Sequence, residues 1–216
     1  MAKHLFNPYS KLKMKNNIDN IYTDHAADFA SSYIEYLSKV LKAINPNEIS
    51  VFIDVLLDAR KCGKNIFFVG NGGSAATASH FANDLAIGTN SYEKPFRAIS
   101  LSDNQAIITA IANDFGYEDI FSRQLQVLGC SGDVLVGISA SGNSPNLIKA
   151  FNYAKQAQMK TFAITAFDGG KMKLIADAGI HVPTGFKEYG PAEDAHMVMD
   201  HLVGAYLIRR VAQEDK

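Results

Sequence analysis

The chain has 216 residues, of which 47% are hydrophobic and 20% charged, and its formal net charge is -1. These values are typical of a soluble globular protein of one domain, and the balanced charge gives no electrostatic argument for a nucleic-acid or membrane partner. No stretch of the sequence reaches the roughly 18 apolar residues that a membrane-spanning helix requires.

The N-terminal third predicts an arm followed by helices. Residues 1–20 are polar and rich in lysine, so we expect a flexible arm there and no secretory signal. Apolar residues recur at helical spacing from Ile21 to Ile44, and after a break a second helix is expected from Glu48 to about Lys61. We assign residues 21–216 to a single domain that includes both helices, which either cover one edge of a sheet or form the core of an oligomer.

After Gly63, short apolar runs alternate with helical patterns. The expected strands are Asn65–Val69, Phe96–Leu101, Val134–Ile138, Thr161–Thr165 and Gly179–Val182. The expected helices are Ser74–Ile87, Asn104–Ala112, Ile120–Leu128, Asn146–Gln156, Lys171–Ala176 and a last one from about Ala192 to Ala212. This alternation predicts the α/β class, with a doubly wound parallel five-stranded sheet and an N-terminal helical extension.

The two cysteines carry little chemistry. Cys62 and Cys130 are far apart in the sequence, and their spacing is neither that of a metal site nor that of a redox motif. They predict buried, reduced thiols. Together with the polar N-terminus, they favour a cytoplasmic protein.

Two loops rich in serine and glycine follow the first and third expected strands. The first reads Gly-Asn-Gly-Gly-Ser at 70–74, and the second reads Ser-Ala-Ser-Gly-Asn-Ser at 139–144, before Pro145. Each opens a helix, whose first N–H groups favour an anion. One such loop alone could be only a tight turn with a helix cap. Two of them at the ligand-binding edge of a parallel sheet favour a phosphate site, and neither loop has a nucleotide-binding fingerprint.

Polar residues on two of the expected helices suggest a cation site. His80 and Asp84 lie four residues apart on one helix face, and Glu193 and His201 lie about 80° apart on the last helix. Two imidazoles and two carboxylates suit a cation such as Zn²⁺. The alternative is that these side chains are solvated positions on amphipathic helices.

His196 and Asp200 lie close to the same site in the sequence. They could replace those ligands in a different geometry. We expect them behind the ligands or on the surface.

Four motifs in order resemble the landmarks of bacterial phosphoheptose isomerases, members of the sugar isomerase (SIS) family. They are Gly-Asn-Gly-Gly-Ser-Ala at 70–75, Ala-Asn-Asp-Phe-Gly at 112–116, Gly-Asp-Val-Leu at 132–135 continued through 137–144, and Asp-Gly-Gly-Lys-Met at 168–172. The resemblance covers about residues 50 to 210. It implies a flavodoxin-like SIS fold, a homotetramer with active sites at subunit interfaces, and a zinc ion.

The resemblance also implies an aldose–ketose isomerase that converts sedoheptulose 7-phosphate to D-glycero-D-manno-heptose 7-phosphate, for the heptose of lipopolysaccharide or capsule. The substrate-binding residues that it implies are Asn71, Gly72, Ser74, Asp103, Ser139, Ser141, Asn143 and Ser144. The serines would hold the phosphate, while Asn71 and Asp103 would lie near the sugar hydroxyls.

The resemblance aligns His80, Asp84, Glu193 and His201 with the family's metal and catalytic residues. Isomerisation through an enediol needs a base, an acid and a group that polarises the carbonyl. We expect Asp84 to be the base, His201 the acid or second base, and zinc the Lewis acid. Glu193 is the other candidate for the base.

The sequence departs from the family pattern at the sugar-reading wall. Asp84 stands where the family usually has Glu, and Glu193 stands where it usually has Gln. The segment from His80 to Asp103 is shorter, Gly88 replaces an arginine, and Gly190-Pro191 replaces Asp-Arg. A different phosphosugar therefore stays open.

Two other functions also stay open. One is a non-catalytic SIS scaffold, similar to the bacterial replication-initiator-associating protein, and the other is a sugar-phosphate sensor. The retained acid–base residues favour the enzyme.

Overall fold

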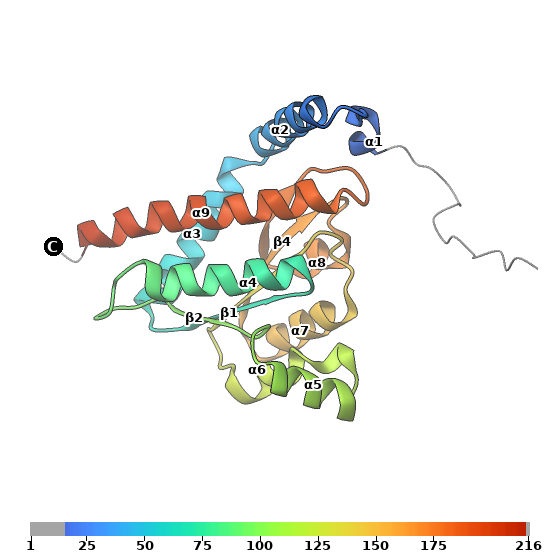
Figure 1. Ribbon diagram of the computed structural model, residues 1–216. Helices are drawn as coiled ribbons and strands as arrows, with labels where there is room; N and C mark the ends of the chain where they lie inside the picture. Colours follow the sequence, from blue (N-terminus) through green and yellow to red (C-terminus); the bar gives the residue numbers. More distant parts are fainter. Residues whose placement is uncertain (1–15, 215–216) are drawn as a thin grey trace, which may run out of the picture.

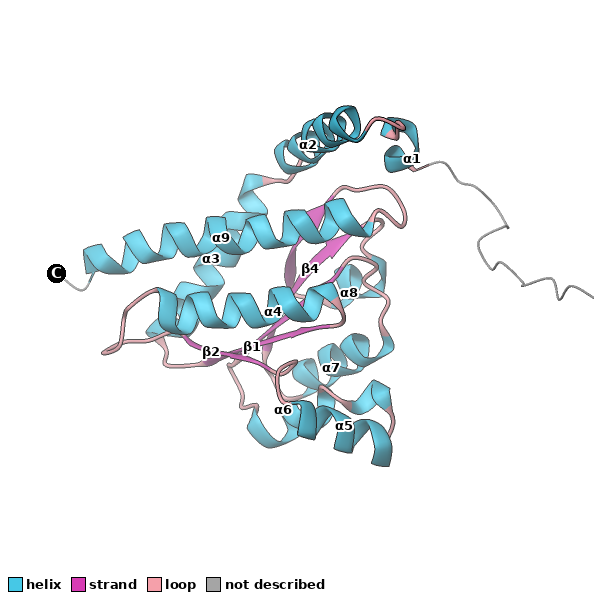
Figure 2. Cartoon of the chain, viewed as in Figure 1, coloured by secondary structure: helices cyan, strands magenta, loops and turns pink. Residues whose placement is uncertain are grey.

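The computed structural model describes residues 16–214. Five strands form one parallel sheet: β1 (Asn65–Gly70), β2 (Arg97–Ser100), β3 (Val134–Ser139), β4 (Lys160–Ala166) and β5 (Ala178–Val182). Their order is β2-β1-β3-β4-β5, so the chain runs outward in both directions from the boundary between β1 and β3 (Figure 2). The predicted doubly wound, five-stranded parallel sheet is confirmed.

Helices cover both faces of this sheet (Figure 1). They are α1 (Asn17–Ile21), α2 (Ala26–Lys42), α3 (Pro46–Lys61), α4 (Gly73–Asn83), the π-helix η1 (Asp84–Gly88), α5 (Gln105–Asp114), the 3-10 helix η2 (Tyr117–Asp119), α6 (Ser122–Leu128), α7 (Pro145–Gln156), α8 (Gly170–Ile175) and α9 (Tyr189–Glu214). Most of the predicted arm, residues 1–15, lies outside the described residues. Its last residues form α1, which begins after a capping box at Asn16.

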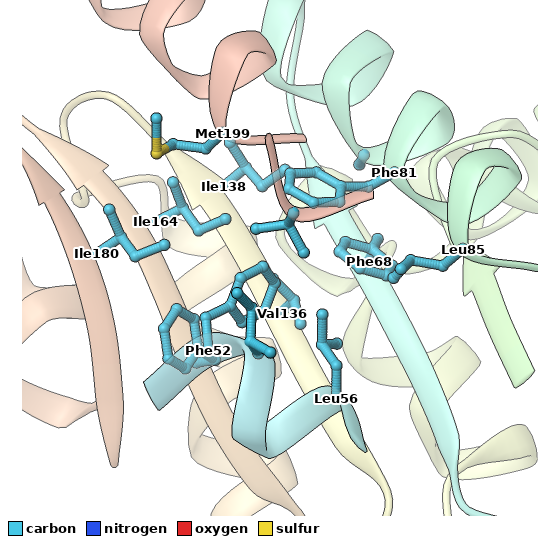
Figure 3. Close-up of a cluster of buried hydrophobic side chains, with 14 of the residues drawn as sticks. Phe52, Leu56, Phe68, Phe81, Leu85, Val136, Ile138, Ile164, Ile180 and Met199 are labelled. Atoms are coloured by element: carbon cyan, nitrogen blue, oxygen red, sulfur yellow. The ribbon is translucent and has the colours of Figure 1, made fainter. Parts of the chain in front are cut away.

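Alternate residues of the central strands β1, β3 and β4 enter two separate hydrophobic cores. On one face, Phe68 stacks on Phe81 of α4 with ring centroids 5.2 Å apart, and Phe52 of α3 stacks on Phe162 at 4.4 Å. α9 closes the same core (Figure 3). The other core contains Phe67 and buried side chains of α6, α7 and α8. Because the central strands β1, β3 and β4 are covered on both sides, their apolar runs are nearly continuous, whereas the edge strand β2 is partly exposed.

The N-terminal helices are fastened to the beginning of α9 by acidic side chains. The buried Glu188 carboxylate accepts hydrogen bonds from the backbone N–H of Asn17 (2.6 Å) and from the Tyr36 hydroxyl. The hydroxyl of Tyr33 donates to Asp194 at 2.5 Å, and burial followed by this carboxylate raises the Tyr33 pKa. α2 therefore lies against α9 on the side away from the sheet (Figure 1).

The prediction of buried thiols is wrong. Cys62 directly follows α3, and Cys130 lies in the loop that precedes β3; both are free and exposed. They occupy chain reversals at the surface, where a small side chain is accepted without being packed.

Candidate functional site

The two serine-rich loops lie next to each other, because they follow the neighbouring strands β1 and β3. The first loop turns sharply: a Cβ on Gly70 would lie 2.3 Å from the carbonyl oxygen of Ser74. Gly72, which caps α4, has φ 55° and ψ -125°, a conformation that favours glycine. The loops thus bring the N-termini of α4 and α7 together at the point where strand order reverses.

A small pocket of about 160 Å³ opens between these loops. Its lining includes five of the predicted substrate-binding residues: Asn71, Ser74, Ser139, Ser141 and Ser144. No lysine or arginine belongs to the lining formed by the described residues. Hydroxyls and two helix N-termini, rather than a cationic side chain, are therefore the groups that can bind an anion here.

The other predicted substrate-binding residues are not in the pocket lining. Gly72 shapes the first loop, and Asn143 ties the second loop to α8 by accepting the backbone N–H of Lys171 at 3.1 Å. Asp103 is exposed and accepts a hydrogen bond from the Ser79 hydroxyl on α4. Asp103 therefore lies beside α4 and outside the pocket lining.

Two side chains that the sequence reasoning missed hold Asn71 in place. The Asn71 side-chain amide exchanges hydrogen bonds of 2.9 and 2.8 Å with that of the buried Asn146, and its oxygen also accepts from the Tyr117 hydroxyl at 3.0 Å. The position of Asn146 in the first turn after the second loop was the available signal. These contacts fix the Asn71 side chain at the pocket wall.

A second polar site lies farther along α4 and α9. His80, Asp84, Asp200 and His201 each offer one ligand atom, and these atoms lie within 4.8 Å of one another. The His80 Nε2 is 3.6 Å from an oxygen of Asp84 and 4.0 Å from an oxygen of Asp200. Three of the four predicted metal ligands are thus brought together, and Asp200 joins them.

Asp200 is the unusual member of this group. Its side chain is fully buried, and neither carboxyl oxygen has a hydrogen-bond partner within residues 16–214. Burial, followed by the charge of Asp84, raises the pKa of Asp200 to about 7. A buried carboxylate without partners is costly unless a cation compensates it, so the residues present fit a bound metal ion.

The expectation that Asp200 and His196 lie on the surface or behind the ligands is corrected in part. Asp200 belongs to the donor group itself. His196, four residues earlier on α9, is fully buried and does not belong to the group. Burial lowers the pKa of His196 to about 4. His196 is therefore a neutral residue of the helix interface.

Glu193 lies apart from this donor group. Its carboxylate packs on Gly73 at the start of α4, so closely that a Cβ on Gly73 would lie 2.2 Å from a Glu193 oxygen. It lines the pocket between the loops, and burial, followed by the charge of Asp194, raises its pKa. The structure brings Glu193 together with the two serine-rich loops and not with His80.

Comparison with known proteins agrees with this architecture. The SIS domain family model matches residues 28–166. A phosphoheptose isomerase from Helicobacter pylori is 38% identical over 181 residues, which cover 84% of this chain and 93% of the relative. The chain belongs to the phosphoheptose isomerases of the SIS family. A relative of the same name from Leptospira biflexa is 40% identical over 79% of this chain and 87% of its own length.

Solved phosphoheptose isomerases have the same fold. The structure from Neisseria gonorrhoeae superposes with a TM-score of 0.73 at 32% identity, covering 84% of this chain and 95% of the other. The structure from Francisella tularensis gives 0.79 at 26% identity, covering 86% and 99%. The predicted family, fold and enzyme class, a sugar-phosphate isomerase, are confirmed. Within residues 16–214, no helix is long and apolar enough to cross a membrane.

Proposed function

We propose that this phosphoheptose isomerase interconverts sedoheptulose 7-phosphate and D-glycero-D-manno-heptose 7-phosphate. Its relatives carry the name of that activity, the pocket between the loops suits a phosphate, and the donor group suits a metal ion. Ser74, Ser139, Ser141 and Ser144 bind the phosphate, and Asn71 contacts a sugar hydroxyl. Gly72 and Asn143 shape the loops that hold these side chains.

The observation that carries this proposal is the spacing of the two polar sites. α4 begins at the phosphate pocket, and His80 follows Gly73 by two helical turns. At 1.5 Å per residue this separation is about 10 Å. A seven-carbon chain with bonds of about 1.5 Å spans a distance of that order. A heptose can therefore place its phosphate at the loops and its carbonyl end at the donor group.

Proton transfer then takes place at the donor group. Asp84 removes a proton from the carbon next to the carbonyl and returns it to the former carbonyl carbon. His201 moves a proton between the two oxygens, so that ketose and aldose keep the same composition. A zinc ion held by this group would polarise the carbonyl and stabilise the charge of the enediolate.

The decisive experiment is an isomerase assay on the purified protein with sedoheptulose 7-phosphate, with added zinc and again after chelation. We expect turnover that chelation removes and zinc restores. Thermal stabilisation by the sugar phosphate without turnover would instead favour a sensor. The absence of both binding and turnover would favour a scaffold.

We also propose a homotetramer whose active sites lie at subunit interfaces. The support is a row of exposed apolar side chains, Val198, Leu202 and Tyr206, at helical spacing along α9. This row lies next to the exposed His201 of the donor group. A second subunit covering the row would bury apolar surface and enclose the site.

Replacing Leu202 with Glu should weaken this assembly, because it places a charge in an apolar interface. We expect the variant to elute as a smaller species in light-scattering chromatography and to lose most of its turnover. Leu174→Glu is the matched control, since Leu174 is exposed on α8, away from this row. An unchanged mass for Leu202→Glu would contradict the proposed interface.

We also propose that residues 21–216 act as one SIS domain, to which α1 joins the end of the predicted arm at 1–20 through the contact of Asn17 with Glu188. The free thiols of Cys62 and Cys130 are compatible with a cytoplasmic enzyme. Its heptose phosphate would supply the synthesis of lipopolysaccharide or capsule.

A further inference from the structure

We propose that Asp200 is the fourth ligand of the metal ion and that Glu193, expected in that role, lies on the sugar-phosphate side of the site. This inference rests on the proposed function for the identity of the metal, zinc. The arrangement of the ligand atoms does not depend on which sugar is isomerised.

The first argument is proximity. Asp200 belongs to the group whose ligand atoms lie within 4.8 Å of one another, and its carboxylate is 4.0 Å from the Nε2 of His80. The rings of His80 and His201 are also neighbours, with centroids 5.0 Å apart. Ligand atoms bound to one zinc ion at about 2.0–2.1 Å are separated by roughly 3–3.5 Å. Small side-chain rotations would therefore close the group around an ion.

The second argument is the isolation of Asp200. Its two oxygens are buried with no hydrogen-bond partner in the described part of the chain, and a second carboxylate, Asp84, belongs to the same group. Two carboxylates that close repel each other unless a cation lies between them. Two carboxylates and two neutral imidazoles balance the charge of one Zn²⁺, and zinc held by four residues can still accept a fifth ligand, such as the oxygen of the sugar carbonyl.

The third argument is the register of the two helices. Glu193 contacts Gly73, Asp200 faces His80, and the next contact pairs Gly204 with Asp84. The same sequence offset separates the partners of every pair, so α4 and α9 run parallel, side by side (Figure 1). Glu193 is two helical turns before Asp200, which is about 10 Å along the helix. That position serves the pocket between the loops, where Glu193 already lies.

Zinc binding without substrate tests this inference. The purified full-length protein is stripped with a chelator, and zinc affinity is then measured by competition with a chromophoric chelator for the parent, Asp200→Asn and Glu193→Ala. We expect Asp200→Asn to weaken zinc binding by about tenfold or more, and Glu193→Ala, which removes the donor atom, to change it by less than about twofold. Weaker binding by Glu193→Ala together with unchanged binding by Asp200→Asn would overturn the assignment, and so would no change in either.

Melting temperatures separate a ligand from a merely structural residue. Asparagine has nearly the same shape as aspartate but carries no charge, so the zinc-free Asp200→Asn protein should melt no lower than the zinc-free parent. Zinc should raise its melting temperature less than that of the parent. A lower melting temperature without zinc, together with an undiminished rise on adding zinc, would assign Asp200 a structural role. Isomerase assays on the same samples keep the proposed function separate, because zinc affinity is measured with no sugar present.

Discussion

Replacing Asp84 with Asn is expected to lower the turnover of sedoheptulose 7-phosphate by about 10³-fold, because a positioned general base contributes roughly 10² to 10⁴. The amide keeps the shape of the carboxylate but cannot accept the proton. Asp84 is half-buried at the beginning of η1, and it packs on the backbone of α9 at Gly204. The fold should therefore survive the change, and the melting temperature of the zinc-free protein checks this.

Asp84 also belongs to the donor group, so the variant has to be assayed at saturating zinc. Turnover close to that of the parent under these conditions would show that Asp84 acts only as a ligand and that its assignment as the base is wrong. Asp54→Asn is the control, since Asp54 is an exposed carboxylate on α3 at a distance from both polar sites. We expect its turnover to equal that of the parent.

The sequence predicted the position of the phosphate-type loops because two local signals coincided there. Continuous apolar runs identified β1 and β3, and parallel strands place their carboxyl ends at one edge of the sheet. The boundaries of these strands and of α7 differ from the prediction by no more than one residue. α2 starts later than predicted, at Ala26, because residues 22–25 between α1 and α2 are not helical.

The composition of the donor group could not be predicted in full, because it depends on the contact between two helices. His80 and Asp84 lie on one helix, so their proximity follows from sequence spacing alone. Asp200 joins them only through the register of α9 against α4. One signal was available: Asp200 follows Glu193 by seven residues, which places the two within about 20° of each other around α9.

The burial of α9 was the least predictable feature. One side of this helix enters the core, while its neighbouring side carries the exposed row that includes Leu202. Both sides are apolar, so the sequence pattern does not indicate which of them faces the sheet. The polar residues between these two sides, such as His201, could be placed only from the structure.

Gly142→Ala is expected to damage both the stability and the phosphate site. Gly142 has φ 59°, and a Cβ at this position would lie 1.9 Å from the carbonyl oxygen of Gly169. The added Cβ would clash with a backbone atom, which cannot rotate away as a side chain can, so one of the two loops would have to move. The N–H of Gly142 also donates to the hydroxyl of Ser139 at 3.1 Å. We expect a loss of about 2–4 kcal/mol in the free energy of unfolding and a raised KM, because the loop that carries the serines is displaced.

Gly63→Ala separates backbone strain from this close contact. Gly63 has nearly the same backbone angle, φ 62°, but no atom lies within 4 Å of a Cβ built there. We expect it to lose only about 1 kcal/mol, the cost of a left-handed conformation, and to keep the KM of the parent. Urea denaturation of both variants at one protein concentration measures the difference. Equal losses in the two proteins would mean that the contact with Gly169 relaxes easily, and an unchanged KM in Gly142→Ala would mean that the second loop does not bind the phosphate.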